Sequence, residues 1–211
     1  GGVMDDLTPL NYVLKKGTSN DAVIEDILKA YPDAVKLKGK NNGWMALHFG
    51  MESNGVSKSA LKLLLSACPE AANTKSSNGL TPLHIGLANN ATNEKIELLL
   101  QRHPAAVREQ DCLGKTPLHI AVENLRTLTE TIVVLARAYP EALAMEDNRR
   151  LTPIQQGMNS GVFTVELMHE LCNIYPDAAK QKDRRKAKMI PLNYIIQKGG
   201  DIITDERIIL D

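Results

Sequence analysis

The 211-residue sequence has few aromatic residues and few cysteines. Aromatic residues make up only 4% of the chain, so Leu, Ile, Val and Ala must fill most of its core, and a hydrophobic content of 43% supports one. The three cysteines, Cys68, Cys112 and Cys172, are odd in number and far apart. This usage fits a reducing compartment better than a disulfide framework.

The sequence also has no net charge and no long hydrophobic run. Lys+Arg and Asp+Glu number 25 each, whereas a dedicated nucleic-acid binder normally carries a basic excess. No segment approaches the roughly 20 apolar residues that cross a bilayer, and no signal peptide is visible at the start. We therefore expect an intracellular protein, most simply cytoplasmic, with nuclear and organellar locations left open and membrane association only through a partner.

What the sequence does contain is one short phrase that returns at a fixed interval. Its copies are Thr8-Pro9-Leu10-Asn11, Met45-Ala46-Leu47-His48, Thr81-Pro82-Leu83-His84, Thr116-Pro117-Leu118-His119, Thr152-Pro153-Ile154-Gln155 and Ile190-Pro191-Leu192-Asn193. Their second residues lie 37, 36, 35, 36 and 38 positions apart. A second mark with the same period ends in proline, with alanine two positions later: Tyr31-Pro32, Cys68-Pro69, His103-Pro104, Tyr139-Pro140 and Tyr175-Pro176. Such a period indicates a solenoid of stacked units, hence one continuous array.

Residues 79–113 predict two helices and a reversal. Thr81 can cap a first helix, Pro82 suits its first turn, and this helix should end near residues 89–90. Ile96, Leu99 and Leu100 then share one face of a second helix, which Pro104 stops. The same offsets give Ile24, Ile27, Leu28; Leu61, Leu64, Leu65; Ile132, Leu135, Ala136; and Met168, Leu171, Cys172.

These marks together resemble the ankyrin repeat over nearly the whole chain. The best copies are residues 79–84 and 111–121. The resemblance implies an all-α solenoid of stacked helix-turn-helix units with hairpin-like connections. We place the repeats at about 7–42, 43–78, 79–113, 114–149 and 150–187, with a partial sixth at 188–211.

Three features depart from the family pattern. The repeats are about 36 residues long, where about 33 is usual. Pro-x-Ala replaces the glycine that usually follows the second helix, and Arg150 stands where the fifth repeat should have glycine. The last repeat reaches Asp211 inside its expected second helix, with apolar residues where an array end needs polar ones. We expect either a degenerate cap or further chain there.

No motif supports catalysis or a cofactor. His48, His84 and His119 form a row, but the same slot elsewhere holds Asn or Gln, which are poor metal ligands and poor bases. In ankyrin proteins this histidine ties neighbouring units together, so we expect a structural role. His169-Glu170 lacks the second histidine of a zinc protease, and Gly114-Lys115-Thr116 lacks the first glycine of a phosphate loop. We therefore expect no enzyme activity, no metal and no cofactor.

One dense run of charge lies before the last repeat. It consists of Lys180, Lys182, Arg184, Arg185, Lys186 and Lys188. Solvated surface is the first interpretation of such a run. The second is docking of an acidic or phosphorylated segment of a partner. Nucleic acid ranks third, because no aromatic residues alternate with these charges to stack on bases.

The resemblance also implies where a partner would bind. Ankyrin proteins generally bind through the connection tips and the exposed edges of the first helices, on the concave face of the array. Carried onto this chain, these positions include Asn41, Asn42, Trp44, Glu52, Asn78, Leu80, Leu113, Lys115, Glu123, Asn148, Arg149 and Leu151.

Trp44, the single tryptophan, stands in the slot that holds Leu80, Lys115 and Leu151 elsewhere. A slot that accepts lysine is expected to face water, and exposed tryptophans are enriched among interface hot spots. Alternatively, Trp44 covers the second repeat, in which Ala46 replaces the proline. Both interpretations stay open at this stage.

The sequence thus predicts a non-catalytic interaction module, or scaffold, that binds another protein. One alternative is a structural subunit permanently embedded in a large assembly. Such a subunit should expose broad apolar patches. The other is a regulatory or targeting segment of a longer enzyme.

Overall fold

The computed structural model describes residues 7–17, 20–161 and 163–179. All regular secondary structure in this part of the chain is helical and consists of α-helices and short 3-10 helices (η). The expected all-α class is thereby confirmed. Within the same residues, no helix has the length and hydropathy that crossing a membrane requires.

Each described repeat contributes a pair of α-helices, and the first four pairs are each followed by a 3-10 helix. The α-helices are α1 (Pro9–Lys16), α2 (Asp21–Ala30), α3 (Ala46–Glu52), α4 (Lys58–Ala67), α5 (Pro82–Ala88), α6 (Asn93–Arg102), α7 (Pro117–Glu123), α8 (Thr129–Ala138), α9 (Pro153–Ser160), α10 (Val165–Ile174) and α11 (Pro176–Ala179). The 3-10 helices are η1 (Pro32–Lys36), η2 (Pro69–Asn73), η3 (Pro104–Arg108) and η4 (Pro140–Ala144). The boundaries between repeats stay a prediction.

The Thr-Pro phrase begins the first helix of a pair, as the sequence indicates. In α9, Thr152 is the N-cap and its hydroxyl accepts the Gln155 N–H at 3.3 Å, while Pro153 occupies the first turn. The threonine hydroxyl accepts a hydrogen bond from a backbone N–H that has no partner within the helix. Proline suits the first turn because it has no backbone N–H that would need a partner. The second helices use other caps: the Ser57 hydroxyl accepts the Ala60 N–H at 2.9 Å at the start of α4.

The residue before each recurring proline ends the second helix. Cys68, for example, has φ −149° and ψ 82°, which is outside the helical region. Proline disfavours the helical conformation of the residue before it, so α4 stops there. The chain then forms η2, whose Ala71 and Ala72 are buried. The sequence argument predicted the stop but missed this 3-10 turn and its counterparts.

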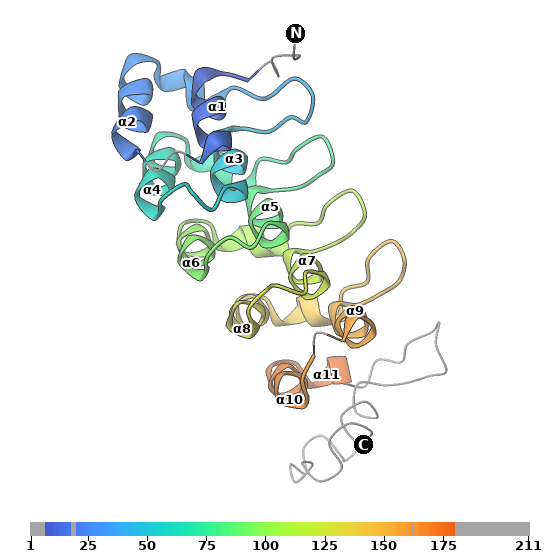
Figure 1. The fold of residues 1–211 in the computed structure, drawn as a ribbon. Coiled ribbons are helices and arrows are strands. Elements are labelled where there is room, and N and C mark those ends of the chain that lie inside the picture. Colours follow the sequence, from blue (N-terminus) through green and yellow to red (C-terminus); the bar gives the residue numbers. More distant parts are fainter. Residues whose placement is uncertain (1–6, 18–19, 162, 180–211) are drawn as a thin grey trace. The chain divides into compact units, whose positions relative to one another are not determined.

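The described chain divides into two compact units, the first ending at Cys112 and the second beginning at Leu113. In the first unit, α1, α3 and α5 follow one another in contact, and α2, α4 and α6 form a second row (Figure 1). In the second unit, α7 packs against α9 and α8 against α10. Within each unit, helix pairs therefore stack side by side.

The apolar face predicted for the second helices is the core of these stacks. Leu64, Ile96, Leu99 and Leu135 are at most 1% exposed. In the first helix pair only Ile24 of the three predicted residues is fully buried; Ile27 and Leu28 are partly exposed. Among the described second helices, α2 packs against α4.

One buried lysine joins helices of neighbouring pairs. Lys95 of α6 is 3% exposed, and its ammonium donates to the Ser53 carbonyl at 2.6 Å and to the Gly50 carbonyl at 3.4 Å. Both carbonyls belong to the C-terminal end of α3, where a positive charge is favourable. Burial lowers the pKa of Lys95. The lysine thus ties the second helix of one pair to the first helix of the preceding pair.

Candidate functional site

The recurring histidine slot is a structural tie between successive repeats. Nδ1 of His48 accepts the Met45 N–H at 3.2 Å, so Nε2 carries the ring proton and donates to the Leu80 carbonyl at 3.2 Å. His48 is fully buried, and burial lowers its pKa to about 4. A neutral imidazole with both nitrogens engaged is a connector between repeats.

The same slot in the second unit has the same geometry. His119 accepts the Thr116 N–H at 3.1 Å and meets the Leu151 carbonyl, 32 residues further on, at 3.0 Å. Gln155 keeps the first bond, because its Oε1 accepts the Thr152 N–H at 3.0 Å. The amide of Asn11, which is buried in the first helix, has no hydrogen-bond partner among the described residues. The structural role expected for these positions is confirmed for His48 and His119.

The connection tips approach one another through their backbones. The Ser77 N–H donates to the Asn42 carbonyl at 2.9 Å, and the Cys112 N–H donates to the Asn78 carbonyl at 3.1 Å. In the second unit, the Asn148 N–H donates to the Leu113 carbonyl at 2.9 Å. These bonds fix the main chain of each tip, so its side chains are presented in a defined position.

The left-handed position of each tip explains the glycines of the repeat. Gly43, Gly79 and Gly114 have φ between 69° and 74°. A Cβ on Gly79 would lie 2.7 Å from the Cys112 nitrogen, so the next tip needs this space. Arg150 holds the equivalent place with φ 61°, an uncommon conformation for a residue with a side chain. The sequence flagged Arg150 as a departure, and the backbone there keeps the glycine conformation.

The predicted partner-binding residues differ in exposure. Asn41, Asn78, Leu113, Glu123, Asn148 and Arg149 are exposed, whereas Asn42, Trp44, Glu52, Leu80 and Leu151 are partly exposed, and Lys115 is buried. Leu113, at 54% exposure, is the most exposed large apolar side chain of the tips. Exposed side chains thus precede the left-handed residue of each tip, whereas the side chain that follows it is partly or fully buried.

Lys115 corrects one sequence argument. We expected the slot after the tip glycine to face water because it accepts lysine, but the Lys115 residue is only 7% exposed. Its ammonium is paired with the Glu123 carboxylate on α7, a contact that neutralises a buried lysine. A lysine can be buried at position 115 because Glu123 of α7 supplies the opposite charge. The spacing of Lys115 and Glu123 in the sequence did not reveal this ion pair.

Trp44 in the same slot is packed rather than free. Its ring stacks on His48 with centroids 5.9 Å apart and forms a T-shaped contact with the Phe49 ring, with centroids 5.1 Å apart. Such contacts stabilise the fold beyond the area that they bury. These contacts favour the interpretation that Trp44 covers the second repeat over the interpretation that it is an interface hot spot. A substitution at Trp44 should therefore lower the stability of the fold, in addition to any effect on the affinity for a partner.

Charged residues gather around the last described tip. The Arg149 guanidinium is 3.4 Å from the Asp147 carboxylate and 3.8 Å from Glu123. Burial alone would raise the pKa of Asp147, but backbone N–H donors from Leu151 and Arg149 outweigh it and lower that pKa. Lys115, Glu123 and Arg149 therefore form one network. The sequence proposed these three as separate contact points.

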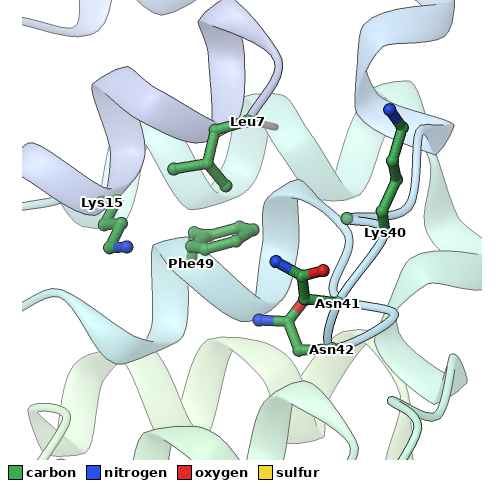
Figure 2. A pocket seen from close by; sticks show the side chains of 7 residues that line it. Leu7, Lys15, Lys40, Asn41, Asn42 and Phe49 are labelled. Atoms are coloured by element: carbon green, nitrogen blue, oxygen red, sulfur yellow. The ribbon is translucent and has the colours of Figure 1, made fainter. Parts of the chain in front are cut away.

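A pocket of about 170 Å³ lies in the first unit. It is lined by Leu7, Lys15, Gly39, Lys40, Asn41, Asn42 and Phe49. Figure 2 shows Leu7 lying over the Phe49 ring, with Lys15 on one side and the two asparagine amides on the other. Asn41 and Asn42 were among the candidates from sequence; Leu7 and Phe49 were not, because they meet only in the folded unit.

The basic run from Lys180 to Lys188 lies outside the described residues, so its role stays a prediction. Among the residues that the structure does describe, no three His, Cys, Asp or Glu side chains gather as metal ligands would.

Comparison with known families bears directly on this stack of helix pairs. A family model described as ankyrin repeats (3 copies) matches residues 51–142. Residues 51–142 are ankyrin repeats. The matched ankyrin repeats include α4 to α8 and the tips around Gly79 and Gly114. Among curated proteins, none matches the sequence. Ankyrin repeats are generally protein–protein interaction modules.

Proposed function

We propose that this ankyrin array is a non-catalytic module that binds another protein through its connection tips and the exposed edges of its first helices. The supporting observation is a contrast between backbone and side chains. The main chain of successive tips follows one pattern of left-handed residues and tip-to-tip hydrogen bonds. The exposed side chains on that pattern differ from tip to tip: Asn41, Asn78, Leu113 and Arg149 are examples.

This contrast favours recognition of a partner over a purely structural role. The backbone arrangement is the same from repeat to repeat, whereas the exposed side chains vary. These side chains can therefore specify a partner without disturbing the stack of helices. Fixed backbones also lower the entropy that binding must overcome, because the presented groups are already ordered. The surface offers amides, a leucine and an arginine, which suits a polypeptide better than a small uniform ligand.

Affinity capture with two matched variants tests the proposal. The first variant, Asn41→Ala with Asn78→Ala and Leu113→Ser, removes exposed tip side chains and leaves every tip glycine intact. The second, Glu97→Ala with Gln101→Ala, changes exposed residues on the second helix α6. Quantitative mass spectrometry then compares proteins captured by the wild type and by each variant, after thermal melting shows that both are folded.

A partner that the tip variant loses and the α6 variant keeps supports binding through the tips. If every captured protein binds all three forms equally, the tip surface is not the site and the proposal fails.

A permanently embedded subunit predicts a different outcome. Such a chain should associate or precipitate when purified alone, because obligate interfaces are large and apolar. A monomer that stays in solution over a concentration series favours the interaction module. Size-exclusion chromatography with light scattering makes this measurement.

A further inference from the structure

The turn between α7 and α8 exposes more apolar side chain than any other segment that the structure describes (Figure 1). Leu125 is 71% exposed and Leu128 is 58% exposed, the two highest values among the large apolar side chains of the described residues. Arg126 between them is exposed as well. Apolar side chains that gather at one exposed place indicate a contact with another molecule.

The start of α8 also lacks the usual cap of a second helix. α4 and α10 begin after Ser57 and Thr164, whose hydroxyls each accept a backbone N–H of the first turn. α8 has Leu128 at this position, and no side chain caps the helix. An uncapped first turn unwinds more readily than a capped one. Residues 129–131 are therefore accessible to an enzyme that binds its substrate as an extended chain.

Three threonines alternate along this segment, and they differ in exposure. Thr129, the first residue of α8, is exposed. Thr131 is only 5% exposed, and the hydroxyl oxygen of Thr127 is buried. An enzyme that acts on the folded chain therefore reaches the hydroxyl of Thr129 and not those of its two neighbours.

An arginine stands three residues before Thr129, and the structure shows that this pair is accessible. In the whole sequence, the spacing from arginine to serine or threonine occurs twice, at Arg126–Thr129 and Arg149–Thr152. Thr152 is 2% exposed and its hydroxyl accepts the Gln155 N–H, so it is excluded as an acceptor. Arg126 is exposed, and no described residue forms an ion pair with it. Many protein kinases select arginine at this spacing, because acidic residues of the kinase groove bind the guanidinium.

We propose that Thr129 is the acceptor of a serine/threonine protein kinase that selects arginine three residues before the acceptor. In this reaction the Thr129 oxygen forms a bond to the γ-phosphorus of ATP, the bond from that phosphorus to the β-phosphate oxygen breaks, and ADP leaves. The hydroxyl proton passes to the catalytic aspartate of the kinase. Leu125, Arg126 and Leu128 supply the exposed side chains that the kinase contacts. Because this turn is not one of the connection tips, the proposal goes beyond the proposed function and does not rest on it.

Phosphorylation would change both the charge and the order of this turn. The phosphate adds about 1.5 to 2 negative charges at neutral pH to a surface that otherwise presents two leucines and one arginine. Negative charge is favourable at the first turn of a helix, and the guanidinium of Arg126 can pair with the phosphate oxygens. We expect amide hydrogen exchange of residues 129–133 to slow by about threefold, the scale of one charge at a helix N-terminus.

Incubation of the full folded chain with Mg·ATP and the active domain of a calmodulin-dependent protein kinase tests the proposal. Trypsin cuts after Arg126, so Thr127, Thr129 and Thr131 fall in one peptide, and fragment ions distinguish them. We expect one phosphate, on Thr129, and none in Thr129→Val. By intact mass, Arg126→Gln should slow the reaction by about tenfold, the scale of one hydrogen bond to a charged group. Arg137→Gln, which changes an exposed arginine at the other end of α8, should leave the rate unchanged.

A synthetic peptide of residues 120–135 separates recognition by the kinase from access in the fold. If the kinase modifies the peptide but not the folded chain, Thr129 is inaccessible and the proposal fails. Equal rates for the wild type and Arg126→Gln would show that the arginine does not direct the kinase. A phosphate chiefly on Thr127 or Thr152, or no modification of either chain or peptide, would equally overturn the assignment. Circular dichroism checks that each variant is folded.

Discussion

Gly79 and Gly161 share a left-handed backbone but have different surroundings. Their φ angles are 74° and 72°, yet a Cβ on Gly79 would meet the Cys112 nitrogen at 2.7 Å, whereas one on Gly161 would meet no atom of the described residues within 4 Å. Gly161→Ala should therefore cost only the conformational penalty, about 1 kcal/mol. Gly79→Ala adds a backbone clash, and we expect a loss of about 2–3 kcal/mol in the free energy of unfolding.

Urea denaturation of the two variants measures this difference, with the slope of the transition checked for a change in unfolding behaviour. Similar losses for both would mean that the contact between tips contributes little, and that the glycine is required by its conformation alone.

The pKa of His48 predicts a loss of stability in acid. Burial lowers the folded-state pKa to about 4, against about 6.5 in an unfolded chain. The unfolded chain therefore takes up the proton first. The stability that comes from a neutral His48 is fully present above pH 6.5 and is lost as the pH falls from about 6.5 to about 4, by about 3 kcal/mol in total.

His48→Gln isolates this contribution. Glutamine already fills the same slot at Gln155, where it accepts the Thr152 N–H, and it does not titrate. We expect the variant to show a flatter dependence of unfolding free energy on pH between 4 and 6.5 than the wild type. Parallel curves for the two proteins would show that His48 is not the group responsible.

Single side chains were the level at which sequence reasoning was weakest. The sequence indicated that Lys115 faces water, since a lone lysine usually does. It could not reveal that Glu123, eight residues further on, turns back to neutralise it. Trp44 was undecided for the same reason, because its ring contacts with His48 and Phe49 depend on how the connection folds over α3.

At the scale of elements, the second helices make the core, and Leu99 tests this directly. It is 1% exposed in α6, while Glu97 of the same helix is exposed. Leu99→Ala should cost about 2–5 kcal/mol, because the removed side chain leaves a cavity that the neighbours fill only in part. Glu97→Ala should change stability by less than about 0.5 kcal/mol, as most surface substitutions do.

Both changes keep a strong helix former in α6, so helix propensity does not explain a difference between them. Thermal and urea unfolding measure it. A loss at Leu99 no greater than that at Glu97 would contradict the assignment of α6 to the core seam.

Elements were predictable where a local rule decides them. The Thr-Pro pair predicts where α5 begins, because threonine caps the helix and proline suits its first turn. The X-Pro pair predicts where α6 ends, because proline disfavours the helical conformation of the residue before it. The 3-10 helix η3 did not. Its Ala106 and Val107 are buried by contacts with other elements, and sequence periodicity over five residues is too short to separate a 3-10 turn from a loop.

For the molecule as a whole, the repeat period carried most of the information. Because six copies of one phrase lie 35 to 38 residues apart, each copy serves as a check on the others, and the all-α stack follows without reference to any single residue. The candidate site is not repeated in this sense. The pocket of the first unit combines Leu7, Asn42 and Phe49 from three segments, and no period connects them.

The stacked design predicts that damage stays local. In a repeat array each helix pair contacts only its neighbours, so stability is nearly a sum of local terms. Leu135, which is fully buried in α8 of the second unit, offers the comparison with Leu99 of the first. Leu135→Ala should accelerate amide hydrogen exchange chiefly in residues 113–179, and Leu99→Ala chiefly in residues 20–112.

Hydrogen exchange followed by mass spectrometry resolves the two units in one experiment, and the wild type supplies the baseline for each peptide. Each variant serves as the control for the other, since both remove the same side-chain atoms from the same kind of helix. If either change raised exchange equally over the whole described chain, unfolding would be all-or-none. The array would then behave as a single cooperative domain, and a partner bound at one tip would stabilise every repeat alike.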